Sequence, residues 1–219
     1  VTFRTDAAKE PAQVLMMVGN GGFEFEDPVG QNILPYFWRP GSGDGVEHKF
    51  PYAAYCGLEG GCDAVAYGGA GGTVAHLMDS KDPTQPKFAH GGLRCVKIDG
   101  QKPEQMCKEG LGFWSPSLPA RPGDTYDISY HVRGRELNPS AGQAVTTFAE
   151  FSDATGQHRQ RITLPAGPAS DKSLTGTFAW TKLAATVNVP TGAQRMRVFL
   201  GLLPAKGQLL FDDVTIKVR

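Results

Sequence analysis

The chain has 219 residues and a mass of 23.5 kDa, which suits one large all-β domain or two small ones. Its 22 basic and 22 acidic residues cancel, which argues against a nucleic-acid-binding or membrane-surface protein, since such proteins usually carry a basic field. No apolar run reaches the ~18 residues of a membrane-spanning helix, so no membrane span is expected. The chain begins with Val1 and shows no recognisable signal peptide, so we expect a processed or excised fragment.

Short apolar segments follow one another from the first residues to the last. Residues 14–18 form a continuous apolar run, typical of a strand buried on both faces. The clearest alternation places Tyr126, Ile128, Tyr130 and Val132 on one face of a strand, with polar residues between them. Further strands are expected over residues 73–79, 92–98, 144–152, 158–164, 183–189, 194–202 and 208–218. These patterns predict about ten to twelve strands in a single domain over residues 1–219, with one helical turn near residues 103–108.

The segment over residues 51–72 is rich in tyrosine and glycine and interrupts the strand pattern. It holds Tyr52, Tyr55, Tyr67, two cysteines and the glycine-rich run 68–72. We expect a long loop here, and loops of this length tend to carry function or a cross-link.

The four cysteines are Cys56, Cys62, Cys95 and Cys107. An even number fits two disulfides in an exported protein, so we expect a secreted or extracellular location. The local pairing joins Cys56 to Cys62 and Cys95 to Cys107, although other connectivities fit the sequence equally. Two alternatives stay open, a zinc site and free thiols in a cytosolic protein, but no C-x-x-C spacing supports the zinc site.

Acidic residues occupy unusual positions in the first and last expected strands. Near the start, Phe23 and Glu24 alternate across a strand. Near the end, the alternation of Val214 and Ile216 extends backwards to place Asp212 on the apolar face. A carboxylate there is costly unless it is paired or bound to a metal. If the terminal strands pair, Glu24 and Asp212 converge, and hard oxygen ligands of this kind suit Ca²⁺. The alternative is two solvated strand ends with ordinary surface acids.

The order of motifs along residues 14–219 resembles the β-sandwich carbohydrate-binding modules, especially the family 4, 9, 16 and 22 types. The matching segments are NGGFE at 20–24, GGLRCVKI at 91–98, RPGDTYDISY at 121–130, FAEFSD at 148–153, VPTGA with RMRV at 189–198, and FDDVTIKV at 211–218. The resemblance implies an all-β jelly-roll sandwich of two antiparallel sheets. It also implies a noncatalytic module that binds a polysaccharide or oligosaccharide beside polysaccharide-degrading catalytic domains. A structural Ca²⁺ would be held by the Gly22 carbonyl, Glu24 and Asp212.

Sugar recognition combines aromatic rings that stack on the sugar with polar side chains that bind its hydroxyl groups. We expect exposed rings at Trp114, Tyr52, Tyr55 and Tyr67, which lie in loops or at strand edges. Trp38 and Trp180 match positions that are structural in the resembled modules, so we place both in the core.

Polar contacts to the sugar are expected from one exposed sheet face. The candidates are Glu150, His131 and Arg197, and the resemblance to the family 4 and 22 modules places their cleft on the concave face.

Two rival functions are a jelly-roll polysaccharide lyase or glycoside hydrolase, and a cell-surface adhesion domain. Tyr130, His131 and Arg133 are the residue types that a lyase uses, but adjacent strand residues face opposite sides. The sequence has no H-E-x-x-H zinc motif, serine-hydrolase elbow or nucleotide-binding fingerprint. We therefore favour a binding module over an enzyme.

Overall fold

The computed structural model describes residues 22–23, 38–43, 53–55, 64–69, 71–78, 84, 87–165 and 174–219. This part of the chain forms thirteen strands and one short 3-10 helix, η1 (Pro103–Gln105), at the expected helical turn. The strands are β1 (Arg39–Ser42), β2 (Ala53–Tyr55), β3 (Ala64–Gly69), β4 (Gly72–Met78), β5 (Arg94–Gly100), β6 (Leu111–Trp114), β7 (Leu118–Pro119), β8 (Thr125–Pro139), β9 (Val145–Ser152), β10 (Gln160–Thr163), β11 (Gly176–Asn188), β12 (Arg195–Leu202) and β13 (Ala205–Val218).

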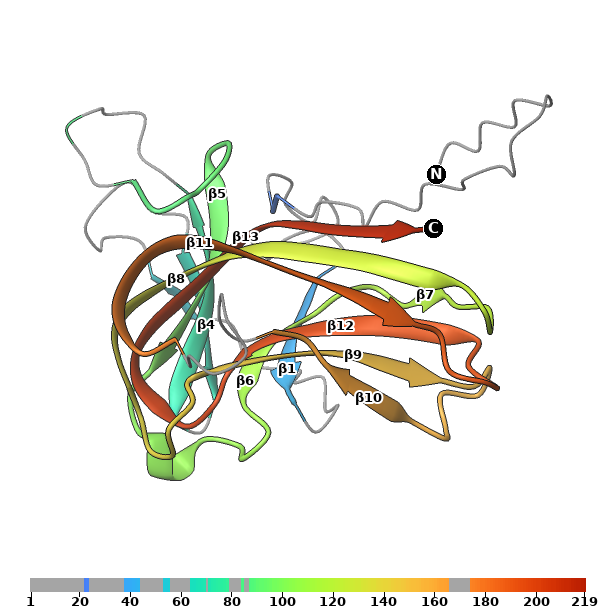
Figure 1. Cartoon of the computed structure of the whole chain (residues 1–219). Helices are drawn as coiled ribbons and strands as arrows, with labels where there is room; N and C mark the ends of the chain where they lie inside the picture. The colour runs from blue at the N-terminus through green and yellow to red at the C-terminus, as the bar shows by residue number, and fades with distance from the viewer. Residues whose placement is uncertain are drawn as a thin grey trace.

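Two antiparallel sheets pack face to face, which confirms the expected β-sandwich (Figure 1). The seven-stranded sheet has the order β11-β8-β13-β5-β4-β3-β2. The six-stranded sheet has the order β1-β6-β12-β9-β10, and β7 pairs with β12 beside this path. Within the described residues, no helix has the length and apolar character needed to cross a membrane.

The core lies between the two sheets and follows the alternation of their long strands. Tyr126, Ile128, Tyr130 and Val132 of β8 all face it and are buried, as the sequence predicts. The Tyr130 hydroxyl hydrogen-bonds Thr147 Oγ1 of the opposite sheet at 2.7 Å, so a polar group inside the sandwich has a partner.

The last strand does not keep the alternation that its sequence predicts. Leu209 and Phe211 face the core together with Val214 and Ile216, so the inward positions change parity. The change falls at a break in the β8–β13 register between Asp212 and Thr215. Asp212 is fully buried, but it belongs to the outer face of the seven-stranded sheet and not to the apolar core face.

Other predictions about local structure need correction. The segment 51–72 contains β2 and β3, which pair as antiparallel strands, so it is not one long loop. Cys95 is buried, and the Cys107 thiol donates to Glu109 Oε2 at 3.0 Å, so these two cysteines form no disulfide with each other. The predicted Cys95–Cys107 disulfide is therefore wrong. Cys56 and Cys62 lie outside the described residues.

The strand at one end of the seven-stranded sheet is irregular. β11 pairs with β8, but its register shifts twice, between Gly176 and Phe178 and between Phe178 and Thr181. From Thr181 to Asn188 the pairing is regular, and Lys182 lies opposite His131.

Candidate functional site

The outer face of the six-stranded sheet carries a buried glutamate between arginines. β9 lies between β12 and β10, and Glu150 of β9 is the cross-strand partner of both Arg197 and Arg161. Directly opposite residues of neighbouring strands point to the same face, so these three side chains meet outside the sandwich. The sequence predicted Glu150 and Arg197 on one face, and the structure confirms that they are together.

Glu150 is held through both carboxylate oxygens. Arg161 Nε donates to Oε2 at 2.9 Å, while Arg197 donates to Oε1 from Nε at 3.0 Å and from a terminal nitrogen at 2.9 Å. Arg159 adds an ion pair at 3.9 Å. The Glu150 side chain is only 2% exposed, so these guanidinium groups satisfy a carboxylate that is withdrawn from water.

An aromatic cluster lies under the arginines. It consists of Trp114, Phe148 and Phe199, whose ring centroids are 4.8–5.4 Å apart. The Arg197 guanidinium lies 3.9 Å from the Trp114 ring centroid and that of Arg161 4.7 Å from Phe148. Trp114 is 0% exposed, so the expectation of an exposed ring here is wrong. Its ring supports the arginines and is not available to stack on a ligand.

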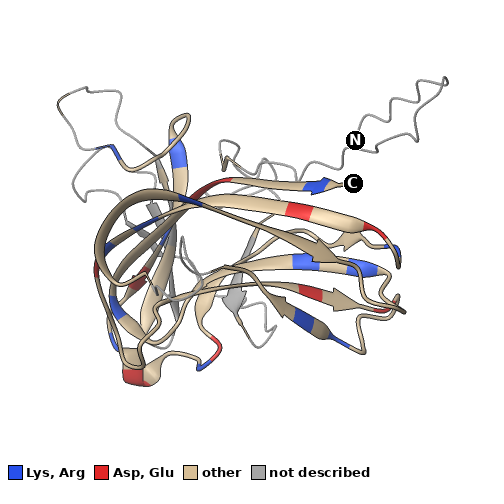
Figure 2. Ribbon diagram, in the orientation of Figure 1, with Lys and Arg blue, Asp and Glu red and all other residues tan. Residues whose placement is uncertain are grey.

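A groove of about 370 Å³ opens beside this array. Arg159, Arg195 and Arg197 line it together with Glu150, so three arginines outnumber one glutamate and the lining carries an excess of two positive charges. In Figure 2 the basic segments of β12 and β10 flank the acidic segment of β9. The other lining residues are Ser117, Ser152, Gly156 and Met196. Such a groove suits a ligand with acidic groups and hydroxyls.

His131 does not join this face. It lies on β8 and points away from the core on the seven-stranded sheet, where it is the cross-strand partner of Asp212. Its expected place beside Glu150 and Arg197 is therefore wrong, because the two groups occupy different sheets. Tyr130 points into the core, so it shares no cleft with His131, which removes the Tyr–His–Arg cluster of a lyase.

Asp212 is buried beneath the segment that precedes β5. Its Oδ2 accepts the backbone N–H groups of His90 at 2.8 Å and Gly91 at 3.1 Å, and its Oδ1 accepts that of Asp213 at 2.7 Å. Burial raises the pKa of Asp212 to about 7, although the three hydrogen bonds act in the opposite direction. Asp212 is buried, but on the outer sheet face with backbone amides as its partners, so the predicted position on the apolar core face is wrong.

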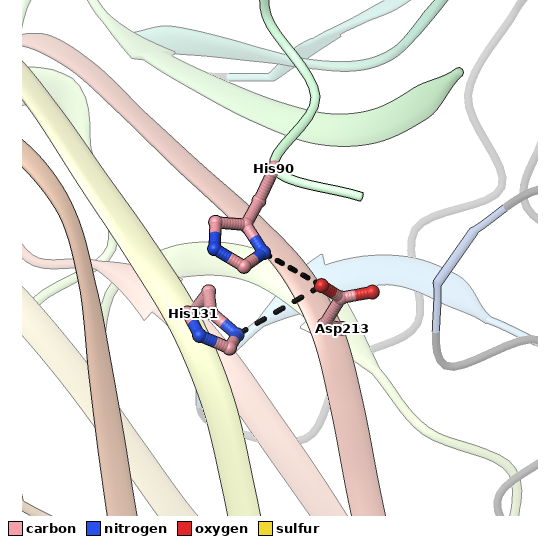
Figure 3. A group of neighbouring side chains, drawn as sticks. All are labelled: His90, His131 and Asp213. Carbon is pink, nitrogen blue, oxygen red and sulfur yellow. Dashed lines mark hydrogen bonds and ion pairs between the residues drawn. The ribbon is translucent and has the colours of Figure 1, made fainter. Parts of the chain in front are cut away.

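A group of titratable side chains adjoins Asp212 and consists of His90, His131 and Asp213, which Figure 3 draws. His90 Nδ1 is hydrogen-bonded to Asp213 Oδ2 at 2.7 Å, and His131 Nδ1 lies 3.9 Å from the same oxygen. The two imidazoles stack with centroids 3.8 Å apart and planes 16° apart. Burial, followed by the neighbouring His90, lowers the pKa of His131.

The remaining predicted residues have mixed outcomes. Trp38 is buried in the core as expected, whereas Trp180 is half-buried outside it, edge-on to His90 with centroids 5.6 Å apart. Tyr55 and Tyr67 lie on β2 and β3, where the structure describes the backbone alone. Tyr52 and Glu24 lie outside the described residues, and Gly22 precedes Phe23, which packs on Trp38.

Sequence reasoning missed Arg159, Arg161, His90 and Asp213 as site residues. Arg161 had a usable signal, because pairing the two expected strands around residue 155 places it near Glu150. His90 had no such signal in the sequence, since it lies in a loop whose position depends on hydrogen bonds from its backbone amides to Asp212.

Comparison with known proteins gives structural matches. No protein-family model matches the sequence, and no curated protein sequence matches it. A cyclase from Fischerella sp. TAU in complex with 4-(1H-indol-3-yl)butan-2-one is similar with a TM-score of 0.55 and 13% identity, over 94% of this chain and 98% of that one. The CBM22-1–GH10 modules of Clostridium thermocellum xylanase Xyn10B, complexed with xylohexaose, give a TM-score of 0.50 and 13% identity over 92% of this chain.

A third similar structure is the C-terminal family 22 carbohydrate-binding module of the same xylanase, with a TM-score of 0.45 and 15% identity over 84% of this chain and 92% of that one. The chain spans 28% of the length of the matched CBM22-1–GH10 xylanase chain. The expected jelly-roll fold, resembling that of carbohydrate-binding modules, is confirmed. Because identities are this low, the likeness concerns the fold, which serves a sugar-binding module in one case and a cyclase in another.

Proposed function

We propose that this protein is a carbohydrate-binding module whose arginine-lined groove binds a glycan bearing carboxylate or sulfate groups. The observation that carries the proposal is the excess of two positive charges in a groove built on the outer sheet face. The jelly-roll fold that it shares with a module of a xylanase supports the sugar-binding part of the proposal. The groove volume of about 370 Å³ falls within the range of about 300–1,000 Å³ that is common for ligand sites.

The chemistry of the lining favours an acidic sugar over a neutral one. Guanidinium groups have no acceptor and donate in a planar fork that matches carboxylate and sulfate oxygens. The Arg159 side chain is 46% exposed and Arg195 is exposed, so both can turn guanidinium donors toward a ligand in the groove. Ser117 and Ser152 add hydroxyls that can both donate to and accept from sugar hydroxyls.

A noncatalytic role fits the way in which Glu150 is held. Both of its oxygens accept hydrogen bonds from arginines, so the carboxylate fixes the guanidinium positions and is not presented as a free acid or base. The proposed partners are polysaccharides or oligosaccharides. Flanking polysaccharide-degrading domains and an extracellular location are also part of the proposal.

A structural Ca²⁺ at Gly22, Glu24 and Asp212 is also part of the proposal. Asp212 is buried on an outer sheet face with three of its roughly four lone-pair sites used by backbone amides, which leaves one for a cation. Burial raises the pKa of Asp212 to about 7 by disfavouring its charged form, and a bound cation would favour that form. We expect EDTA to lower the melting temperature and excess Ca²⁺ to restore it; an unchanged melting temperature would remove this ion from the proposal.

Isothermal titration and affinity electrophoresis test the glycan site. The panel contains unsubstituted xylan, glucuronic-acid-substituted xylan, polygalacturonate and a sulfated glycan. We expect the acidic polymers to bind more tightly, and their binding to weaken with salt. Arg195→Gln and Arg159→Gln should each lower the affinity about tenfold, since each removes a charge-assisted hydrogen bond of at least about 1.5 kcal/mol.

The matched control is Lys206→Gln, which removes one positive charge from β13 of the other sheet and should leave binding unchanged. Equal binding of neutral and acidic glycans, unaffected by the arginine variants, would overturn the acidic-ligand site. A wild-type protein that binds no glycan on the panel would overturn the module itself.

A further inference from the structure

We propose that His90, His131 and Asp213 bind a divalent first-row transition-metal ion, with Zn²⁺ the best match, on the outer face of the seven-stranded sheet. One donor atom from each residue lies within 4.8 Å of the other two. This metal site is on the opposite sheet from the arginine groove and involves neither Gly22 nor Glu24. It is independent of the proposed glycan groove, and it shares with the proposed calcium site only the supporting residue Asp212, which is not one of its three ligands.

Three separate features of the fold bring the donors together (Figure 3). His131 points outward from β8 beside Asp212 of β13. The register break after Asp212 puts Asp213 at a φ of 48°, in the left-handed region, and presents its carboxylate at the same face. The hydrogen bonds that the His90 and Gly91 backbone amides donate to Asp212 then hold His90 over the Asp213 carboxylate.

The segment before β5 packs closely against the carboxylate. A Cβ atom added to Gly91 would lie 2.9 Å from Asp213 Oδ2 and 3.0 Å from Oδ1. Glycine at this position is what allows the backbone to approach Asp213. The buried Asp212 thus acts on the metal site as an outer support, which positions ligands without binding the ion.

The donor distances are close to those of a tetrahedral site. Zn²⁺ binds imidazole nitrogen and carboxylate oxygen at about 2.0–2.2 Å, so neighbouring donors in a tetrahedron are about 3.3–3.5 Å apart. The observed distances to Asp213 Oδ2 are 2.7 Å from His90 Nδ1 and 3.9 Å from His131 Nδ1, which bracket that value. The three donor atoms lie within 4.8 Å of one another, so binding requires them to draw together and the stacked imidazole rings to tilt, while the ion replaces the proton shared by His90 and Asp213.

The type of donor selects the kind of metal. Two imidazoles and one carboxylate suit Zn²⁺, Co²⁺ or Ni²⁺, whereas Ca²⁺ takes six to eight oxygen ligands. Three protein ligands leave a fourth position for water, as in open zinc sites. Among the described residues, His131 Nδ1 is shielded from solvent and has no hydrogen-bond partner, so its donor atom is not engaged elsewhere.

Two residues beside the metal site should affect or report metal binding, Lys182 through its charge and Trp180 through its fluorescence. Lys182 is the cross-strand neighbour of His131, and its positive charge opposes a bound cation. Trp180 lies edge-on to His90 with centroids 5.6 Å apart. Because Trp180 contacts His90, a bound Co²⁺ or Ni²⁺ should quench the fluorescence of this tryptophan.

The test uses the whole chain, stripped with a chelator and returned to buffer. Zn²⁺ is titrated by calorimetry, and Co²⁺ is titrated with absorption and fluorescence readouts. We expect one Zn²⁺ per chain from this site, a visible Co²⁺ spectrum of a low-coordinate N/O site, and quenching of Trp180. His90→Ala, His131→Ala and Asp213→Asn should each weaken Zn²⁺ binding more than about tenfold. Lys182→Met should strengthen it.

His158→Ala is the matched control, because that imidazole is 86% exposed on the turn between β9 and β10 and should leave Zn²⁺ binding unchanged. Asparagine tolerates the positive φ of Asp213, and His90 is solvent-exposed, so those two variants should fold even if His131→Ala does not. Near-UV circular dichroism checks the fold of each. Absence of Zn²⁺ binding by the wild type, or full Zn²⁺ binding by folded His90→Ala and Asp213→Asn variants, would overturn the site.

Discussion

Among the described residues, each outer face of the sandwich buries one carboxylate, but the two faces satisfy it in different ways. Glu150 lies on a regular three-strand pairing and is neutralised by the side chains of Arg161 and Arg197. Asp212 lies at a break in strand register and is hydrogen-bonded by three backbone amides, with no arginine or lysine contact among the described residues. The first arrangement leaves excess positive charge at the surface, and the second leaves its negative charge uncompensated.

This difference explains why the two faces suit different ligands. Cationic side chains in register create a flat donor surface for oxyanions. A carboxylate that orders backbone amides instead fixes the course of a loop, and in this protein the loop carries His90 to His131 and Asp213. The distinction can be tested residue by residue.

The largest effect is expected for Trp114→Ala. The ring is fully buried under Arg197 and packs on Phe148 and Phe199, so its removal leaves a cavity and should lower the free energy of unfolding by about 3–5 kcal/mol. Urea unfolding measures this loss. Leu93→Ala, at a side chain that is 47% exposed, should change stability by less than about 0.5 kcal/mol and serves as control. A Trp114→Ala protein as stable as the wild type would contradict the packing role.

Glu150→Gln should follow, with a loss of about 3 kcal/mol in the free energy of unfolding, because the arginines around a nearly buried site lose their counter-charge. Urea unfolding again measures it. Glu104→Gln, on the exposed 3-10 helix, removes the same charge and should have little effect. If both variants lose equal stability, net charge and not the arginine array is responsible.

Asp212→Asn should cost less, about 2 kcal/mol. The asparagine amide has one acceptor oxygen and one donor nitrogen, so at least one of the three backbone N–H groups loses its partner. Thermal unfolding in EDTA measures the loss without any contribution from a bound cation. Hydrogen exchange should locate it at the amides of His90 and Gly91, and unchanged protection there would argue against the anchor.

The smallest effect concerns the turn that carries Arg159. Asp153 accepts hydrogen bonds from Thr155 and Gln157, and the Thr155 hydroxyl is the main cause of its lowered pKa. Because the folded pKa lies below the ordinary value, Asp153 contributes stability above about pH 4, which is lost as the pH falls through the folded value. Asp153→Asn should therefore flatten the acid limb of a stability profile between about pH 2 and 5. An unchanged acid limb would show that this turn is not stabilised by the charge.

The fold could be predicted from the sequence more fully than the sites. The alternation over residues 126–132 gave the correct inward face of β8, and Glu150 and Arg197 were correctly placed together. The wrong predictions have local physical causes. Alternation could not reveal the register break at Asp213, and residue type alone could not show that Arg197 covers the ring of Trp114.

Irregularity in β11 has a consequence for behaviour at high concentration. A long strand at the end of a sheet offers unpaired N–H and C=O groups to a second molecule, which promotes aggregation. The two register shifts near Phe178 make the first part of β11 irregular, and Lys182 places a positive charge on the regular part. We expect these two features to oppose edge-to-edge pairing between molecules, so a regular register near Phe178 or loss of the Lys182 charge should make the protein less soluble.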